Sequence, residues 1–311
     1  MGKIAFLFPG QGAQQVGMGK SLAENKEQAR KLFAQADEAL GFSLSDLCFS
    51  GPEEKLRLTT YAQPAILTAS IALWATYSEQ LPQPDYVAGH SLGEYSALVA
   101  AQAISFTDAV KVVHQRGMFM EEAVPAGQGA MSAVIGMDRE ELDRICLESS
   151  SEDLVVQPAN YNSPGQIVIS GHKQAVEKAG KIALESGARR VIPLSVSGPF
   201  HSRLMKPAAD KLAPILDNVS LKDAAIPVVA NVTAEPVVSQ EEIRRSLVAQ
   251  VDSPVLWEDS MRWMLAQGVD TFVEIGPGNV LTGLIRKIDR RVRAFSAHDE
   301  ATMLRAIQSL Q

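Results

Sequence analysis

Gly89-His90-Ser91-Leu92-Gly93 is the stretch of this 311-residue chain that indicates its fold. It follows a short apolar run at residues 86–88 and precedes a helix-like run at 94–101. A strand, a tight turn and a helix in this order form a nucleophile elbow, with Ser91 at its apex. The helix behind the turn directs free backbone N–H groups toward the serine oxygen. The stretch therefore predicts an α/β protein with a nucleophilic serine.

Alternating strands and helices extend outward from this elbow. An apolar strand is expected at 4–8, and further strands at 227–230 and 271–275. Helices are expected at 18–39, 63–77 with Pro64 near its first turn, 107–122 with Thr107 as N-cap, 240–251 and 280–288. Short apolar strands that alternate with helices are typical of a mostly parallel sheet with both faces covered. The expected core is an α/β-hydrolase-like fold.

A different pattern occupies the middle of the chain. Strands are expected at 130–135, 154–156, 166–169 and 190–196, helices at 138–147 and 174–185, and a turn at 162–165. The order βαββαβ is that of a ferredoxin-like unit. We therefore expect residues 126–197 to form an inserted subdomain, and residues 1–125 and 198–311 to form the catalytic core.

Composition excludes several classes of protein. The net charge of −7 argues against general binding of nucleic acid. Cys48 and Cys146 stand far apart, which fits a reducing, cytoplasmic setting. The longest apolar runs are too short to cross a membrane, and we find neither a metal-type Cys/His cluster nor a nucleotide phosphate loop. We expect no membrane span, no metal and no cofactor.

A serine nucleophile needs a base, and the chain has five histidines. His201 lies where the expected insert rejoins the core, and such a junction faces a cleft between subdomains. From its position alone His201 is the leading candidate, and an ordinary loop histidine is the alternative. The loop Pro9-Gly10-Gln11-Gly12 could present an N–H group to the same site, together with that of Leu92, or it could be a simple tight turn.

Seven motifs occur in one order along the chain and carry a resemblance. They are Phe8-Pro9-Gly10-Gln11-Gly12, Gln63-Pro64-Ala65, Gly89-His90-Ser91-Leu92-Gly93-Glu94-Tyr95, Gln115-Arg116-Gly117, Asn162-Ser163-Pro164-Gly165-Gln166, Pro199-Phe200-His201-Ser202 and Glu274-Ile275-Gly276-Pro277-Gly278. Together they resemble the malonyl-CoA:acyl-carrier-protein transacylases of bacterial fatty-acid synthesis. The resemblance runs from residue 4 to about 295 and is specific because it rests on all seven motifs. It also implies an inserted ferredoxin-like unit.

The resemblance implies roles for individual residues. Ser91 would form a malonyl-serine intermediate, and His201 would act as its base. The remaining implied roles are oxyanion binding by the N–H groups of Gln11 and Leu92, carboxylate binding by Arg116, orientation of the histidine by the backbone carbonyl of Gln250, and substrate-pocket contacts by Asn162 and Phe200. A large ring at Phe200 would crowd a 2-methyl branch. From local sequence alone, Arg116 could also be an ordinary surface cation on a helix.

The implied reaction moves a malonyl group from malonyl-CoA to the phosphopantetheine thiol of acyl carrier protein. Carrier proteins of this pathway are acidic, so we expect docking on local cations at Arg189, Arg190, Arg286 and Lys287. Two alternatives come from other classes of protein. One is a serine esterase or thioesterase that uses water, and the other is a carrier-binding module without activity, which the presence of Ser91, His201 and Arg116 disfavours.

Overall fold

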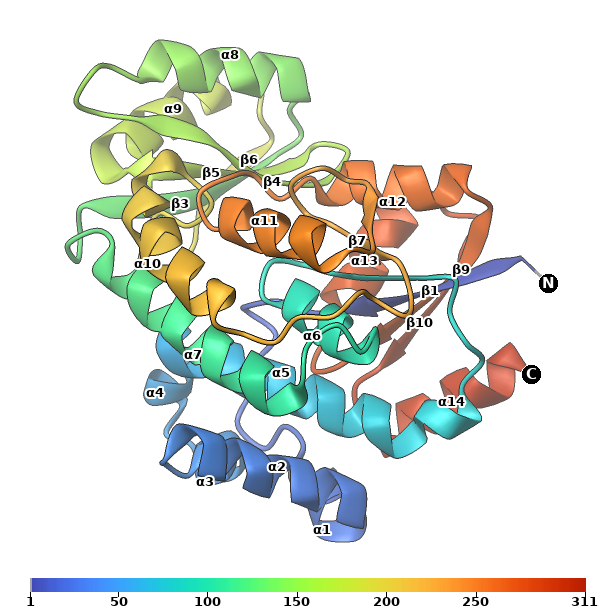
Figure 1. Ribbon diagram of the computed structural model, residues 1–311. Helices are drawn as coiled ribbons and strands as arrows, with labels where there is room; N and C mark the ends of the chain where they lie inside the picture. The colour runs from blue at the N-terminus through green and yellow to red at the C-terminus, as the bar shows by residue number, and fades with distance from the viewer. Residues whose placement is uncertain (1) are drawn as a thin grey trace.

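The computed structural model describes residues 2–311 and contains two separate sheets (Figure 1). The larger sheet has the order β10-β9-β1-β2-β7-β8. Its strands are β1 (Lys3–Phe8), β2 (Tyr86–Gly89), β7 (Val228–Val229), β8 (Pro236–Val237), β9 (Val269–Ile275) and β10 (Arg293–Ala297). Every pair in it is parallel except β7 with β8. The expected α/β class with a mostly parallel sheet is confirmed.

Helices cover both faces of the larger sheet, and the alternation along β1 shows how. Phe6 and Phe8 pack on one face and Ala5 and Leu7 on the other. The first face is covered by α2 (Glu27–Leu40), α5 (Thr59–Tyr77), α6 (Gly93–Ala100), α7 (Phe106–Glu122), α10 (Lys206–Asp217), α11 (Gln240–Gln250) and α14 (Glu300–Leu310). The second is covered by α12 (Trp257–Ala266) and α13 (Val280–Ile288). Smaller helices are α1 (Lys20–Asn25), α3 (Leu44–Ser50) and α4 (Glu53–Arg57).

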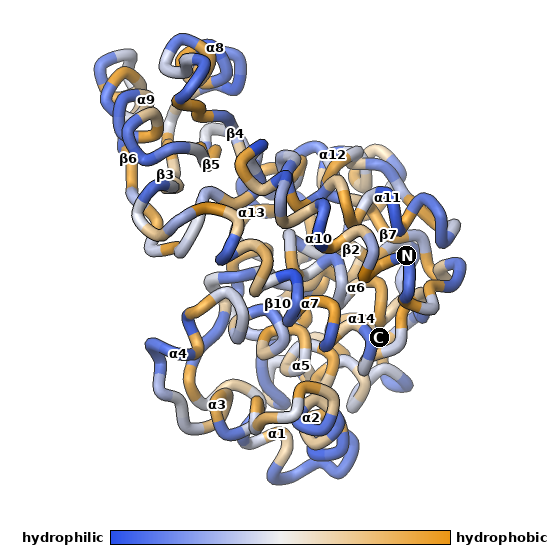
Figure 2. Tube along the Cα trace, turned by 60° about the vertical axis from the view of Figure 1, so that its left-hand side comes forward, coloured by the Kyte–Doolittle hydropathy of each residue, from blue (hydrophilic) through white to orange (hydrophobic). Residues whose placement is uncertain are grey.

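The second sheet is antiparallel, with the order β4-β5-β3-β6. It is built from β3 (Gly129–Ile135), β4 (Val156–Ser163), β5 (Gln166–His172) and β6 (Arg190–Pro193). The helices α8 (Arg139–Ser149) and α9 (Lys173–Glu185) share its apolar core. This part stands out from the rest of the molecule at one end, as the turned view shows (Figure 2).

Three expected helix features are wrong. The helix expected at 18–39 is two helices, because Lys26 adopts an extended conformation between α1 and α2. The N-cap of α7 is Ser105 and not Thr107, since the Ser105 side chain accepts from the N–H of Asp108 at 3.1 Å. Pro64 lies inside α5, which begins at Thr59.

The interior proline is tolerated because its missing N–H is replaced. In a regular helix residue 64 would donate to the carbonyl of Thr60. That carbonyl instead accepts from Nδ1 of His114 on α7, at 3.0 Å. The contact therefore explains how α5 accommodates Pro64, and it gives His114 a structural role.

Strand boundaries also differ from expectation. The strand expected at 154–156 begins at Val156 and runs to Ser163 through Pro158. A proline fits there because β4 is at the edge of its sheet, where the missing N–H breaks no ladder. The strand expected at 190–196 ends at Pro193. The helices α10, α12 and α14 and the strand β10 were not expected.

Candidate active site

The elbow places Ser91 between β2 and α6 in a strained conformation. Its φ is 51°, a left-handed value that costs a non-glycine residue on the order of 1–3 kcal/mol. The turn is closely packed, because a Cβ on Gly93 would lie 2.1 Å from the carbonyl oxygen of Phe8. Helix α6 therefore crosses β1 at a distance that only glycine allows, and Ser91 is held at the carboxyl end of the sheet.

His201 is brought to the serine by the segment that returns from the smaller sheet. Ser91 Oγ lies 2.7 Å from His201 Nε2, and His201 Nδ1 lies 2.9 Å from the carbonyl oxygen of Gln250. Gln250 is the last residue of α11, so its carbonyl has no partner within the helix. Because a carbonyl only accepts, it fixes the proton on Nδ1 and leaves Nε2 to accept from the serine hydroxyl.

Burial keeps the His201 ring neutral. Two effects lower the pKa of His201 to about 3: the larger is the loss of water on burial, and the smaller is the nearby positive charge of Arg116. A neutral imidazole is the form that can take a proton from Ser91. The negative end of α11 would favour the imidazolium once it forms.

Arg116 lies behind the serine as a buried cation. Its side chain on α7 donates from Nη2 to Ser91 Oγ at 3.2 Å and to Oε1 of Gln250 at 2.9 Å, and from Nη1 to Oε1 of Gln63 at 2.8 Å. Within residues 2–311 no carboxylate lies at ion-pair distance from it, and its Nε has no partner. Burial lowers its pKa. An unpaired guanidinium beside a candidate nucleophile is costly unless a ligand supplies an anion.

The site opens into a pocket of about 480 Å³ between the two sheets. Its lining includes Ser91, His201, Gln11 and Phe200. The N–H groups of Gln11 and Leu92 donate to no acceptor among the described residues. Leu92 directly precedes α6, whose first N–H groups, from Gly93 to Tyr95, donate to the carbonyls of residues 90–92. The free N–H of Leu92 therefore lies at the positive end of the helix dipole, where an anion is favoured.

Asn162 is placed beside the elbow and not on the pocket wall. Its Oδ1 lies 2.8 Å from Nε2 of His90, which lines the pocket. The asparagine of β4 that lines the pocket is Asn160. The hydrogen bond between His90 and Asn162 ties the smaller sheet to the elbow.

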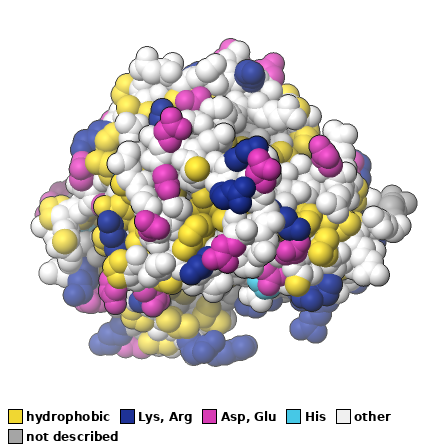
Figure 3. Space-filling view, turned by 90° about the horizontal axis from the view of Figure 1, so that it is seen from below, with side chains coloured by type: hydrophobic (Ala, Val, Ile, Leu, Met, Phe, Trp, Pro, Cys, Tyr) yellow, Lys and Arg dark blue, Asp and Glu magenta, His cyan; other side chains and the backbone are white. Residues whose placement is uncertain are grey.

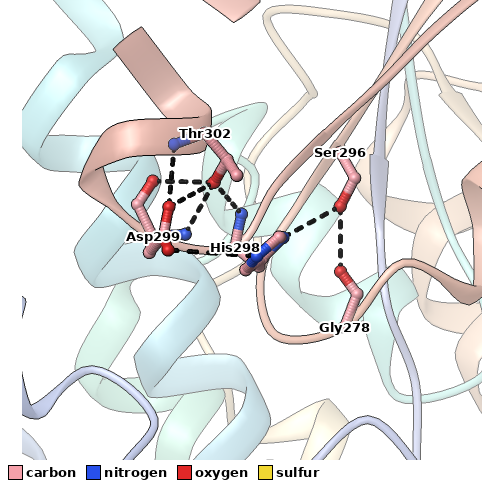
Figure 4. A network of polar contacts seen from close by, with 5 residues as sticks. All are labelled: Gly278, Ser296, His298, Asp299 and Thr302. Atoms are coloured by element: carbon pink, nitrogen blue, oxygen red, sulfur yellow. Dashed lines mark hydrogen bonds and ion pairs between the residues drawn. The ribbon is translucent and has the colours of Figure 1, made fainter. Parts of the chain in front are cut away.

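The other histidines have partners away from the serine. His90 contacts Asn162, His114 contacts Thr60, and His172 Nδ1 accepts from the N–H of Val155 at 2.9 Å. His298 lies 3.2 Å from Ser296 Oγ in a polar network near the start of α14 (Figure 4). Among the described residues, His201 is the histidine that contacts Ser91.

Three functional neighbours escaped the sequence analysis: Gln63, Glu94 and Asn231. Gln63 and Glu94 stand within quoted motifs but received no role. Asn231 follows β7 at the carboxyl end of a parallel strand, which is where ligand-binding and catalytic side chains gather in such sheets. That position was the available signal for it.

The remaining candidate residues lie on the surface. Arg189, Arg190, Arg286 and Lys287 are all exposed. Lys287 Nζ on α13 donates to Oε1 of Gln166 at 2.8 Å, and Gln166 pairs with Ile135, which pairs with Arg190. These cations therefore border one end of the smaller sheet.

Residues 2–311 lack two features that would indicate other classes of protein. None of the helices there is long and apolar enough to cross a bilayer, and no trio of His, Cys, Asp or Glu is arranged to hold a metal. Cys48 and Cys146 are free and buried, and burial raises the pKa of each thiol to about 12.

A mostly parallel sheet with helices on both faces defines the chain as an α/β protein, and its candidate site joins a serine at the end of a strand to a neutral histidine. The acyl transferase domain family matches residues 5–304. The chain is 54% identical over 311 residues to the malonyl CoA-acyl carrier protein transacylase of Bacillus subtilis (strain 168), covering 100% of this chain and 98% of that one. The chain belongs to the malonyl CoA-acyl carrier protein transacylases, a family of transferases.

Solved structures agree with this membership. An acyl carrier protein S-malonyltransferase from Vibrio cholerae superposes with a TM-score of 0.95 at 46% identity, over 98% of this chain and 99% of that one. A malonyl-transacylase in complex with its holo type II PKS acyl-carrier protein has a TM-score of 0.96 at 45% identity, over 99% of both chains. The family indicated by the sequence motifs is confirmed.

Proposed function

We propose that this protein transfers the malonyl group of malonyl-CoA to the phosphopantetheine thiol of acyl carrier protein, for fatty-acid synthesis. The observation that carries the proposal is the guanidinium of Arg116, which is buried, lacks a carboxylate partner among residues 2–311 and lies 3.2 Å from Ser91 Oγ. A malonyl group bound as an ester of Ser91 has a free carboxylate that Arg116 can pair with. An ordinary esterase substrate has no such group.

In the first half-reaction Ser91 Oγ attacks the thioester carbonyl while His201 Nε2 takes its proton. The N–H groups of Gln11 and Leu92 stabilise the oxyanion. The carbon–sulfur bond then breaks, and His201 returns the proton to the departing CoA sulfur. Malonyl-Ser91 remains, with Arg116 on its carboxylate.

In the second half-reaction His201 takes the proton of the carrier thiol. The sulfur attacks the ester carbonyl, the bond to Ser91 Oγ breaks, and the proton passes to the serine. Splitting the transfer into two steps needs no cofactor beyond the carrier-bound phosphopantetheine. The ring of Phe200 forms part of the pocket wall and would exclude a 2-methyl branch.

The proposal extends to the finer fold and its division. The order β3-α8-β4-β5-α9-β6 and the strand order β4-β5-β3-β6 support a ferredoxin-like subdomain at residues 126–197. The strand–turn–helix elbow supports an α/β-hydrolase-like core at 1–125 and 198–311. Buried free thiols and the family support the cytoplasm as its location.

We propose that the carrier docks on Arg189, Arg190, Arg286 and Lys287. Strand β6 runs from Arg190 toward Leu194, which lines the pocket, so this surface leads to the pocket mouth. On the face seen in Figure 3, positive and negative side chains are interspersed. Such a mixed surface gives an acidic partner less steering.

Intact-mass measurement after brief exposure to malonyl-CoA tests the function. We expect a gain of one malonyl group in the wild type, none in Ser91→Ala, and release of the group on addition of holo carrier protein. A mass gain that persists in Ser91→Ala would contradict the nucleophile. Release that is equally fast in buffer alone would indicate a thioesterase that uses water.

A further inference from the structure

The side chain of Asn231 bridges the elbow from the end of its strand, at Gly89, to Ser91. Its Nδ2 donates to the carbonyl of Gly89 at 2.8 Å, and its Oδ1 accepts from the N–H of Ser91 at 2.7 Å. The residue is fully buried and lies two residues after β7, the neighbour of β2 in the sheet. One amide thus joins the last residue of the strand to the apex of the turn.

Hydrogen bonds with Glu94 and Gln250 fix the position of Asn231. The backbone N–H of Asn231 donates to Oε2 of Glu94 on α6 at 2.9 Å. Gln250 Nε2 donates to the same Glu94 oxygen at 2.9 Å and to the carbonyl of Ser91 at 3.0 Å. Asn231 can bind in only one orientation, because reversing its amide would place a donor against the Ser91 N–H and an acceptor against the Gly89 carbonyl.

We propose that Asn231 is a positioning residue for the acyl transfer, which holds Ser91 in its left-handed conformation so that Oγ reaches His201. Occupying the Ser91 N–H also leaves the next N–H, that of Leu92, as the free donor of the turn. The inference rests on the proposed role of Ser91 as nucleophile. Holding the elbow in this way needs a side chain at position 231 with one donor and one acceptor at a fixed separation, and the amide of Asn supplies both.

The test measures how fast a fluorophosphonate probe labels the serine, followed by intact mass, beside the kcat and KM of malonyl transfer. For Asn231→Ala we expect a loss of about 10²-fold in labelling rate and in kcat, with the KM for malonyl-CoA within about twofold of the wild type. Met303→Ala is the control for lost stability, because it creates a cavity in the core beneath α14. In this variant the probe should label Ser91 at the wild-type rate.

Asn231→Asp keeps the shape and the acceptor, so it tests the donor. At about pH 9 its carboxylate would face the Gly89 carbonyl, and we expect labelling at least about tenfold slower than in the wild type. Burial would raise the pKa of this acid above the ordinary value of about 3.9, so the fraction that can donate, and with it the labelling rate, should rise as the pH falls toward about 6. The ionisable groups around the amide are Glu94, and Arg116 and His201 through Gln250 and Ser91. Because Glu94 contacts residue 231 and has a pKa of about 7, the comparison is made in a Glu94→Gln background, which removes its titration.

Two results would overturn the inference. One is Asn231→Ala labelling no slower than Met303→Ala, and the other is Asn231→Asp matching the wild type from pH 6 to pH 9. Failure of the proposed function gives a different result, since Ser91→Ala would then label as fast as the wild type.

Discussion

The amide of Gln250 separates two buried charged side chains. Its Oε1 accepts from Arg116, and its Nε2 donates to Glu94. Its backbone carbonyl at the same time orients His201. One residue therefore contacts both the proposed base and the proposed carboxylate-binding cation, so the proposed mechanism needs no acidic third member.

Removing the Arg116 side chain should change the selectivity for malonyl over acetyl groups more than it changes the folded structure. We expect Arg116→Ala to lower malonyl transfer about 10- to 150-fold more than acetyl transfer, because a charged hydrogen-bonded pair contributes about 1.5–3 kcal/mol and acetyl has no charge to pair. Steady-state kinetics with both acyl-CoA substrates measures this. Arg144→Ala, on the exposed surface of α8, is the control, and equal losses for both substrates would assign Arg116 to the fold alone.

Glu94 should make stability depend on pH. Burial raises its pKa to about 7 from the ordinary 4.5, so between these values the folded protein binds a proton that the unfolded chain has lost. Stability from this group is therefore complete below pH 4.5 and falls as pH rises to 7.

Glu94→Gln removes that dependence. We expect the difference in free energy of unfolding, variant minus wild type, to increase by on the order of 3 kcal/mol as the pH rises from 4.5 to 8. Urea unfolding at several pH values measures the difference, with exposed Glu140→Gln as control. A difference that shrinks with increasing pH would show that the carboxylate is stabilised in the folded state.

At the scale of elements, the sequence predicted those parts that local rules determine. The elbow and α13 (Val280–Ile288) lie where expected, because glycines and apolar periodicity mark them. The break at Lys26 and the length of β4 depend on tertiary contacts that no local pattern records. The contact between Asn231 and Glu94 could not be predicted for the same reason, since the two residues meet only when α6 packs beside the end of β7.

The crossing of α6 over β1 should not tolerate a methyl group. Gly93→Ala places a Cβ against the carbonyl oxygen of Phe8, so we expect a loss of about 3 kcal/mol, at the upper end for overpacking, and weaker labelling of Ser91. Thermal unfolding measures it. Gly283→Ala on α13 is the matched control: nothing lies within 4 Å of its Cβ, and stability should rise by up to about 1 kcal/mol. Equal stability of the two variants would contradict the close crossing.

At the scale of the whole molecule, the pocket lies between two sheets of different kinds. The larger sheet supplies Ser91, and the segment that follows β6 supplies Leu194, Phe200 and His201. Substrate would therefore enter where the smaller part meets the larger, next to the proposed docking cations.

Charge reversal should separate docking from chemistry. In the double variant Lys287→Glu and Arg190→Glu we expect a higher KM for carrier protein and unchanged loading of Ser91 from malonyl-CoA. The reason is that only the carrier protein binds to this surface. The carrier reaction of the wild type should also weaken with salt, since exposed charges are screened over about 8–10 Å. Lys31→Glu on α2 is the control, and carrier kinetics indifferent to both changes would exclude this docking surface.

The parallel pairing of β1 with β9 has a consequence for synthesis on the ribosome. The serine at 91 emerges long before the histidine at 201, the carbonyl at 250 and the strand Val269–Ile275 that flanks β1. A nascent chain thus carries its reactive hydroxyl without the partners that activate it. With Ser91 as the proposed nucleophile, the protein would become able to attack a thioester only when almost all of it has been made, and unfinished chains would not consume acyl-CoA.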